Sequence, residues 1–192
     1  MPQGRGLLHQ KLGRALIKLP NSLLARMKNY PVGGLPMARK KKRAWSIGDI
    51  FCIPLSDGTY SIGQVVGQEP EALNSVICVF FSRRLGTVPI QLDGQLSERE
   101  LLSVLFVTRD LLDSGDWQVF CRTEPFPIRK YMNVSALKAA GFVGVDIIGS
   151  GIVMKFLNAY HNLYPWNGFY EPDYLDRLLV SADKKPSHVL LI

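Results

Sequence analysis

The sequence lacks the motifs by which most enzyme classes are recognised. It contains no HExxH, no GxSxG, no Walker loop and no GxGxxG after a strand-like segment, so zinc-protease, serine-hydrolase and nucleotide-binding chemistry have no signal here. Histidine is also scarce, and only His161 falls well inside the predicted folded part. At the end of a predicted helix, its more common role is structural. We therefore expect no catalytic residue, no metal and no cofactor.

Cysteine and long apolar runs are equally sparse. The three cysteines, Cys52, Cys78 and Cys121, lie far apart and without CxxC spacing, which fits neither a disulfide framework nor a zinc site. Buried free thiols in a reducing compartment are the expectation. No apolar run approaches the about 18 residues that span a membrane. The N-terminus lacks the apolar region of a secretory signal.

Acidic residues are absent from the start of the chain. Residues 1–48 contain eleven Lys or Arg and no Asp or Glu, so residues 49–192 carry a net charge of −4. Leucines from Leu8 to Leu19 recur at helical spacing opposite basic residues, as in helices that lie on membrane surfaces or target organelles. The alternative is a solvated extension, and residues 1–36 read as an upstream addition before Met37. We predict a flexible basic extension over 1–44 and a single domain over 45–192.

Residues 45–66, WSIGDIFCIPLSDGTYSIGQVV, organise this domain. Asp57-Gly58 between two β-rich runs predicts a hairpin with a two-residue loop. That register pairs Leu55 with Tyr60 and Ile53 with Ile62 on one face. Ile50 and Cys52 make the other face apolar too, which predicts a hairpin covered on both sides.

The remaining segments predict strands first and helices last. We expect strands at 75–82, 103–108, 117–122, 142–148 and 188–192, with Arg83 ending the first of these. Helical segments are expected after Ser97, at 135–140, at 152–161 and at 171–180, and a turn at 113–116. This order predicts an α+β fold: a mostly antiparallel, strongly twisted sheet or small, partly open barrel, with C-terminal helices packed on it.

An aromatic and acidic segment near the C-terminus is the strongest candidate for a binding surface. Six of the fifteen residues 160–174 are Phe, Tyr or Trp, a composition typical of interface hot spots. We define the C-terminal patch as six residues, Trp166, Tyr170, Glu171, Asp173, Tyr174 and Asp176. The alternative is that Trp166 and Tyr170 clamp helices onto the sheet. Asp173 and Asp176 could also complement a helix dipole, or serve a hydrolase with His161 if all three met at a pocket.

Three blocks of the sequence resemble a known family. IGDIFCIPLSDGTYSIGQV, SGDWQVF and FLNAYHNLYPWN with EPDYLDRLL are similar to bacterial immunity protein 26, from polymorphic toxin systems, over residues 46–179. The resemblance implies a non-enzymatic cytoplasmic inhibitor that binds one cognate antibacterial toxin, encoded by a neighbouring gene. A net acidic body suits a basic partner, such as a nuclease or nucleotide-targeting toxin. The C-terminal patch is then the predicted toxin-facing surface.

A nucleic-acid-binding module is the alternative function. It would combine a small barrel with the basic N-terminal arm and use strand aromatics as stacking platforms. Such a module needs exposed strand aromatics and basic residues on the body, whereas the positive charge lies in residues 1–48. The predicted partner is therefore a protein, with no obligatory nucleic acid. The oligomeric state stays open, because hydrophobic edge strands can be capped by a second subunit or by the toxin.

Overall fold

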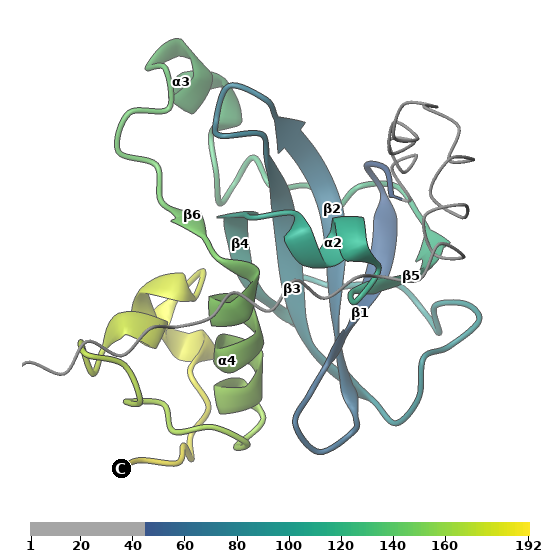
Figure 1. Ribbon diagram of the computed structural model, residues 1–192, viewed down its shortest axis with the longest axis vertical. Helices are drawn as coiled ribbons and strands as arrows, with labels where there is room; N and C mark the ends of the chain where they lie inside the picture. Colours follow the sequence, from purple (N-terminus) through teal and green to yellow (C-terminus); the bar gives the residue numbers. More distant parts are fainter. Residues whose placement is uncertain (1–44) are drawn as a thin grey trace, which may run out of the picture. The chain divides into compact units, whose positions relative to one another are not determined.

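The computed structural model of the protein describes residues 45–192 (Figure 1). The extension and amphipathic helix predicted within residues 1–44 lie outside the described residues. Six strands form one sheet in the order β5-β1-β2-β3-β4-β6. They are β1 (Asp49–Pro54), β2 (Tyr60–Glu69), β3 (Ser75–Leu85), β4 (Leu101–Val107), β5 (Gln118–Arg122) and β6 (Ile147–Ile148).

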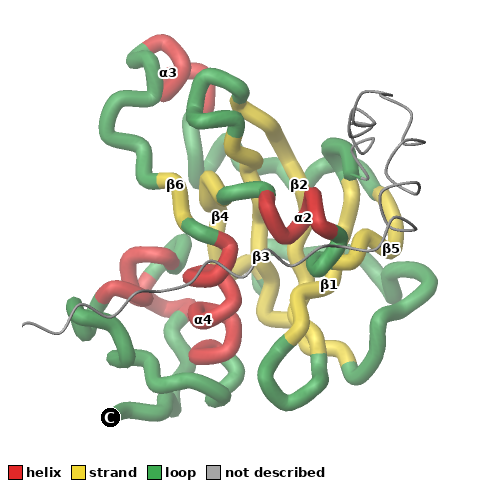
Figure 2. The backbone as a smooth tube through the Cα atoms, in the orientation of Figure 1, coloured by secondary structure: helices red, strands yellow, loops and turns green. Residues whose placement is uncertain are grey.

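Neighbouring strands are antiparallel except for β4 and β6. The sheet is open, with β5 and β6 at its edges. Its helical elements are α2 (Asp110–Ser114), α3 (Val134–Ala139), α4 (Ser150–Tyr160), and the 3-10 turns η2 (Tyr174–Leu178) and η3 (Ala182–Lys184). Figure 2 shows that loops make up much of the remaining chain. The predicted α+β class with a mostly antiparallel sheet is confirmed.

The first hairpin forms, but its predicted register is wrong by one residue. Pro54 pairs with Tyr60 and Cys52 with Ile62, whereas a two-residue loop would have paired Ile53 with Ile62. The amide of Leu55 bonds the Thr59 carbonyl, and Gly58 is left-handed at φ 83°. A three-residue loop of this kind needs one positive φ, not two. The one-residue shift places Ile62 on the opposite face of the sheet from Ile53.

One face of the sheet is covered by helices. Leu112 of α2 and Phe156 of α4 pack there with β-strand residues in the largest core cluster. The two helices lie on the same side of the sheet in Figure 1. At the centre, Trp117 stacks on Phe51 with ring centroids 5.1 Å apart, and Phe80 meets Trp117 edge-on at 6.0 Å. This aromatic group joins β1 and β3 to the chain that enters β5.

The other face is covered by loops. Ile50, Ile62, Val79 and Phe81 pack there with residues of the 86–97 and 123–131 segments. The prediction that the first hairpin is covered on both sides is therefore confirmed. β3 is buried on both faces over most of its length, as its uninterrupted apolar run predicted.

Arg83 does not end β3 as predicted, because β2 continues to pair with β3 at Arg84 and Leu85; the Arg83 side chain instead holds the neighbouring loop. Its guanidinium forms an ion pair with Glu100, with Nε 2.7 Å from Oε1. It also donates to the carbonyl oxygens of Asp93 and Gln95. β3 continues to Leu85, and the 86–97 loop is tied back onto the sheet. Hydrogen bonds from Arg83 are the main cause of a lowered pKa at Glu100.

Four further secondary-structure predictions, all between residues 97 and 180, differ from the structure. The Glu100 carboxylate accepts from both the Ser97 amide and the Ser97 hydroxyl, which is half of a capping box, but the chain enters β4 at Leu101 without a helix. The turn predicted at 113–116 overlaps α2, which runs to Ser114. Phe142 adopts φ 58°, so the strand predicted over 142–148 is reduced to the two residues of β6. The predicted 171–180 helix is only the 3-10 turn η2, because tertiary contacts override weak local propensity there.

The segment 188–192 forms no strand. The Trp166 amide bonds the Leu190 carbonyl, and Asn167 exchanges side-chain bonds with the backbone of Ile192. These contacts hold the segment as an irregular extension against residues 166–167. The other helices match their predictions, since α3 and α4 occupy the expected segments.

Candidate functional site

The loop-covered face contains a cavity that begins at Gln64. This side chain comes from β2, where it is 1% exposed, and polar groups at such depth need hydrogen-bond partners. Its Nε2 lies 3.0 Å from both Thr123 Oγ1 and the Glu124 carbonyl oxygen, and 3.2 Å from that of Gly48. Its Oε1 accepts from the Phe126 amide at 2.9 Å. Gln64 thereby fixes the segment after β5 to the middle of the sheet.

Aromatic packing completes the attachment of this segment. The Phe126 ring meets Phe81 of β3 edge-on, with centroids 5.4 Å apart. Pro125 and Pro127 flank Phe126, and proline favours an extended backbone in the residue before it. The segment 123–127 therefore crosses the sheet as one wall, opposite the loop that Arg83 holds.

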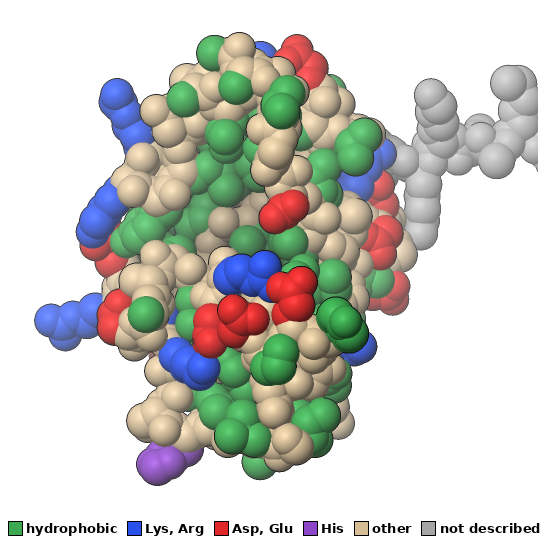
Figure 3. Space-filling view, turned by 90° about the vertical axis from the view of Figure 1, so that its left-hand side faces the viewer, with side chains coloured by type: hydrophobic (Ala, Val, Ile, Leu, Met, Phe, Trp, Pro, Cys, Tyr) green, Lys and Arg blue, Asp and Glu red, His purple; other side chains and the backbone are tan. Residues whose placement is uncertain are grey.

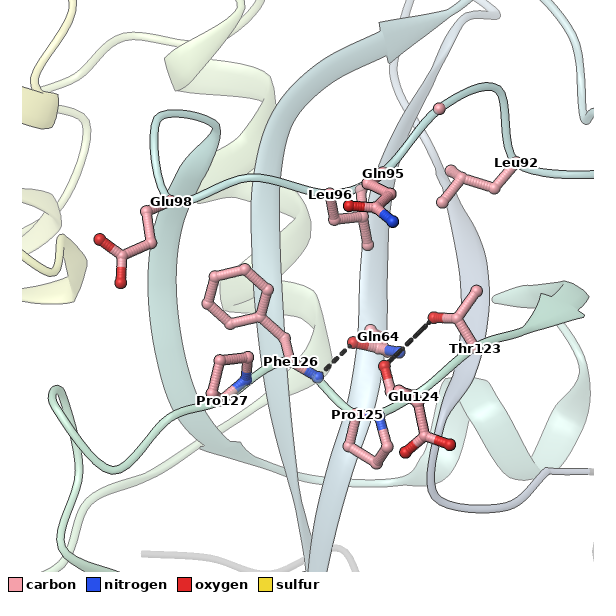
Figure 4. A pocket seen from close by; sticks show the side chains of 11 residues that line it. Gln64, Leu92, Gln95, Leu96, Glu98, Thr123, Glu124, Pro125, Phe126 and Pro127 are labelled. Carbon is pink, nitrogen blue, oxygen red and sulfur yellow. Dashed lines mark hydrogen bonds between the residues drawn. The ribbon is translucent and has the colours of Figure 1, made fainter.

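Between these walls lies a cavity of about 570 Å³. Figure 4 shows Leu96 and Gln95 on one side, Phe126 and the two prolines on the other, and Gln64 between them. We call this hollow the loop cavity; its lining is Gln64, Leu92, Gly94, Gln95, Leu96, Glu98, Thr123, Glu124, Pro125, Phe126 and Pro127. Its volume falls within the roughly 300–1,000 Å³ range of ligand pockets.

Sequence reasoning missed the loop cavity. Its walls are two irregular segments about thirty residues apart in the chain, and neither carries a periodic pattern. A usable signal was Gln64, the one polar side chain within residues 62–66 of β2, because a buried amide marks a point where another segment must supply hydrogen bonds.

The C-terminal patch divides into buried and exposed residues. Trp166 is 1% exposed and packs near Phe156 of α4, with ring centroids 6.2 Å apart. Its Nε1 donates to Asp176 Oδ1 at 2.8 Å, and Asp176 also pairs with Lys185. Trp166 thus connects α4 with η2, which agrees with the alternative, structural role considered for it from the sequence. Its hydrogen bond holds Asp176 at the base of the C-terminal patch.

The other patch residues lie at the surface. Tyr170 is fully exposed and Tyr174 half-buried. Tyr174 stacks on Phe169 at 5.0 Å and lies under the Arg177 guanidinium, which is ion-paired with Glu171. Figure 3 shows acidic and basic side chains interleaved on one face. Within residues 45–192, the Asp173 carboxylate forms no ion pair, so it is the least compensated charge of the patch.

His161 lies apart from these carboxylates. Its ring contacts Tyr160, and the charges that influence it belong to Arg84 and Asp57 at the first hairpin. Burial, followed by repulsion from Arg84, lowers the pKa of His161 to about 4, while Asp57 opposes the shift. The imidazole is therefore neutral at pH 7. His161 interacts with residues of the first hairpin, whereas Asp176 interacts with Trp166 and Lys185. These separate sets of contacts do not support a hydrolytic site shared by His161 and Asp176.

We expect His161 to make the protein less stable in acid. Its folded pKa of about 4 lies below the 6.5 of the unfolded chain, so the unfolded state binds more protons between these values and stability falls as pH decreases through them. After allowance for partial exposure, His161→Gln should remove about 1–2 kcal/mol of the loss between pH 7 and pH 4.5. Urea unfolding of both proteins at both pH values measures this. Parallel losses would contradict the assignment.

The three cysteines are the remaining candidate nucleophiles in the described part of the chain. Cys52 and Cys78 are buried and Cys121 half-buried, all as free thiols. Burial raises the pKa of Cys52 to about 11 and also raises the pKa of Cys78 and Cys121, so none is a thiolate at neutral pH. No cluster of three metal-ligating side chains occurs within residues 45–192. Over the same residues, no helix has the length and apolarity to cross a bilayer.

Comparison with known proteins confirms the family resemblance for the first two sequence blocks, whereas the third block lies outside the matched residues. The model of the family described as immunity protein 26 matches residues 46–129. The matched range runs from before β1 to just after the Pro125–Pro127 wall, and it includes every residue that lines the loop cavity. The C-terminal patch lies beyond it. No curated protein and no solved structure matches the chain.

Proposed function

We propose that this protein, which matches immunity protein 26 over the first five strands of its sheet, neutralises a cognate antibacterial toxin by direct protein–protein contact. The family match over residues 46–129 is the observation that carries this proposal. The role is non-enzymatic and is exercised in the bacterial cytoplasm. The toxin is expected from a neighbouring gene, and a basic nuclease or nucleotide-targeting toxin suits the acidic body.

Burial of the strand aromatics favours this function over a nucleic-acid module. Phe51, Phe80 and Phe81 are fully buried between the sheet and its covering segments. A stacking platform must offer aromatic faces to bases, and these rings face the core. The described residues also carry more acidic than basic side chains, which opposes binding to phosphates.

The C-terminal patch remains our proposal for part of the toxin-facing surface. Tyr170 and Asp173 are its exposed members, Glu171 and Tyr174 border them, and the buried Trp166 supports the surface by holding Asp176. An exposed tyrosine is a typical anchor of protein interfaces, and Asp173, three residues later in the chain, adds an exposed negative charge.

Substitutions at the exposed members test this surface. Tyr170→Ala combined with Asp173→Lys should weaken toxin binding by about tenfold or more through loss of an anchor and reversal of charge. Both side chains are exposed, so the midpoint of urea unfolding should barely change. Val143→Ala, at another exposed apolar residue, is the control. Unchanged affinity in the folded double variant would remove the patch from the interface.

The function itself is tested by protection in cells. The full chain is co-expressed with the product of the adjacent gene, and the two are co-purified. Growth rescue together with a stoichiometric complex is the expected result. A toxic neighbour that is neither bound nor neutralised, with single-stranded nucleic acid bound instead, would overturn the proposal.

A further inference from the structure

We propose that the loop cavity is a docking site for an apolar side chain of a protein partner that is flanked by Lys or Arg. The identification of this partner as the toxin rests on the proposed function. The cavity itself is defined by the Gln64 floor, the loop that carries Leu96 and the Pro125–Pro127 wall.

The hydrogen bonds of the floor favour an apolar occupant. Both Gln64 side-chain atoms are engaged within the protein, Nε2 with three oxygens and Oε1 with the Phe126 amide. A polar small molecule is usually oriented by several convergent groups with free hydrogen-bonding capacity. Here the floor has little of that capacity left, while Leu92, Leu96 and Phe126 offer apolar surface.

The wall also disfavours strand addition by a partner. Pro125 and Pro127 have no amide hydrogen, and the Phe126 amide is bonded to Gln64. Three successive residues therefore offer no backbone donor to an incoming strand. A partner must bind here mainly through its side chains, since strand addition depends on main-chain hydrogen bonds.

Negative charge at the rim favours basic flanking residues in the partner. The lining includes Glu98 and Glu124 but no Lys or Arg. In Figure 4, Glu98 lies at the left of the residues drawn and Glu124 lies below Gln64, beside Pro125. Glu98 is paired with Lys130 at 3.0 Å. Within residues 45–192 the Glu124 carboxylate forms no ion pair, so it is the rim charge most available to a partner. Complementary charge at a rim mainly affects association rate and specificity.

The location of the cavity connects it with the family match. All of its lining residues fall within residues 46–129, whereas the C-terminal patch falls outside. The cavity is thus a feature of the part of the chain that matches immunity protein 26.

A peptide titration followed by NMR tests the proposal without the toxin. The full chain, labelled with ¹⁵N, is titrated with three capped peptides: Lys-Trp-Lys, Glu-Trp-Glu and Lys-Ala-Lys. We expect Lys-Trp-Lys to shift the Gln64 side-chain amide and the Phe126 backbone amide, and to bind about tenfold more tightly than either other peptide. Glu124→Lys should abolish the preference for Lys-Trp-Lys over Glu-Trp-Glu. Glu71→Lys, at an exposed residue of the β2–β3 turn, should preserve it.

Two results would overturn the docking site. One is equal binding of Lys-Trp-Lys and Lys-Ala-Lys, and the other is binding that leaves the Gln64 and Phe126 signals unmoved. Because this experiment uses no toxin, its failure is separate from failure of the protection assay. If the wild-type chain protects cells and the peptides fail to bind, the toxin contacts another surface.

Discussion

Trp117→Ala should lower the free energy of unfolding by about 3–5 kcal/mol, the range typical of truncating a buried Trp. The Trp117 side chain is 1% exposed and is stacked almost parallel on Phe51, with an interplanar angle of 6°. Phe80 closes the group from β3. Truncation leaves a cavity where three segments of the sheet meet and removes both ring contacts. Urea denaturation at pH 7 measures the loss.

Trp117→Phe is the matched control. It keeps an aromatic ring against Phe51 and removes an indole N–H that has no hydrogen-bond partner in the described structure. The expected loss is smaller, about 1–2 kcal/mol, because part of the cavity remains unfilled while the cost of burying an unpaired donor disappears. Equal losses for the Ala and Phe variants would show that ring stacking contributes little here.

Gln64→Leu should lower the free energy of unfolding by about 2–4 kcal/mol, although leucine is similar in size and more apolar. The substitution leaves the Phe126 amide without its acceptor and the Glu124 carbonyl without its strongest donor. It should also loosen the Pro125–Pro127 wall and therefore the loop cavity. Urea unfolding gives the energy, and amide hydrogen exchange at Phe126 reports the local opening.

Gln64→Glu separates hydrogen bonding from side-chain volume. At pH 7 the carboxylate can still accept from the Phe126 amide, but its second oxygen faces three oxygens where Nε2 stood. We expect a folded-state pKa above that of an ordinary Glu, so the variant should recover stability relative to wild type as pH falls toward 4. Gln64→Leu should show no such recovery. Identical pH profiles of the two variants would contradict the proposed role of Gln64.

The central strands could be predicted from sequence. β3 is apolar on both side-chain parities, and the segment 49–69 contains β-rich runs around Asp57-Gly58. The first pattern reflects burial of a strand on both faces, and the second reflects a turn that needs a positive φ. Each pattern lies within one short stretch of the chain. The resemblance to immunity protein 26 likewise rested on sequence blocks, and the family match begins at the same residue, 46.

The register of the first hairpin and the location of the candidate sites were decided only by tertiary structure. Whether Gly58 is the last residue of a two-residue or a three-residue loop depends on which pairing buries Ile53 and Ile62 on the correct faces. Trp166 and Tyr170 lie four residues apart in one aromatic segment, yet one is buried and the other fully exposed. Nothing local distinguishes them, because the difference arises from the packing of Trp166 on Phe156 of α4.

The sequence by itself determined the fold class, the central strands and the family resemblance, since each depends on residues close together in the chain. The existence and position of the loop cavity were decided only by the tertiary structure. Its floor comes from β2 and its walls from segments that Gln64 and Arg83 fasten to the sheet through hydrogen bonds across 10 to 62 residues. Such bonds form only after the sheet has brought their partners together, because each single contact is too weak to order a distant loop by itself.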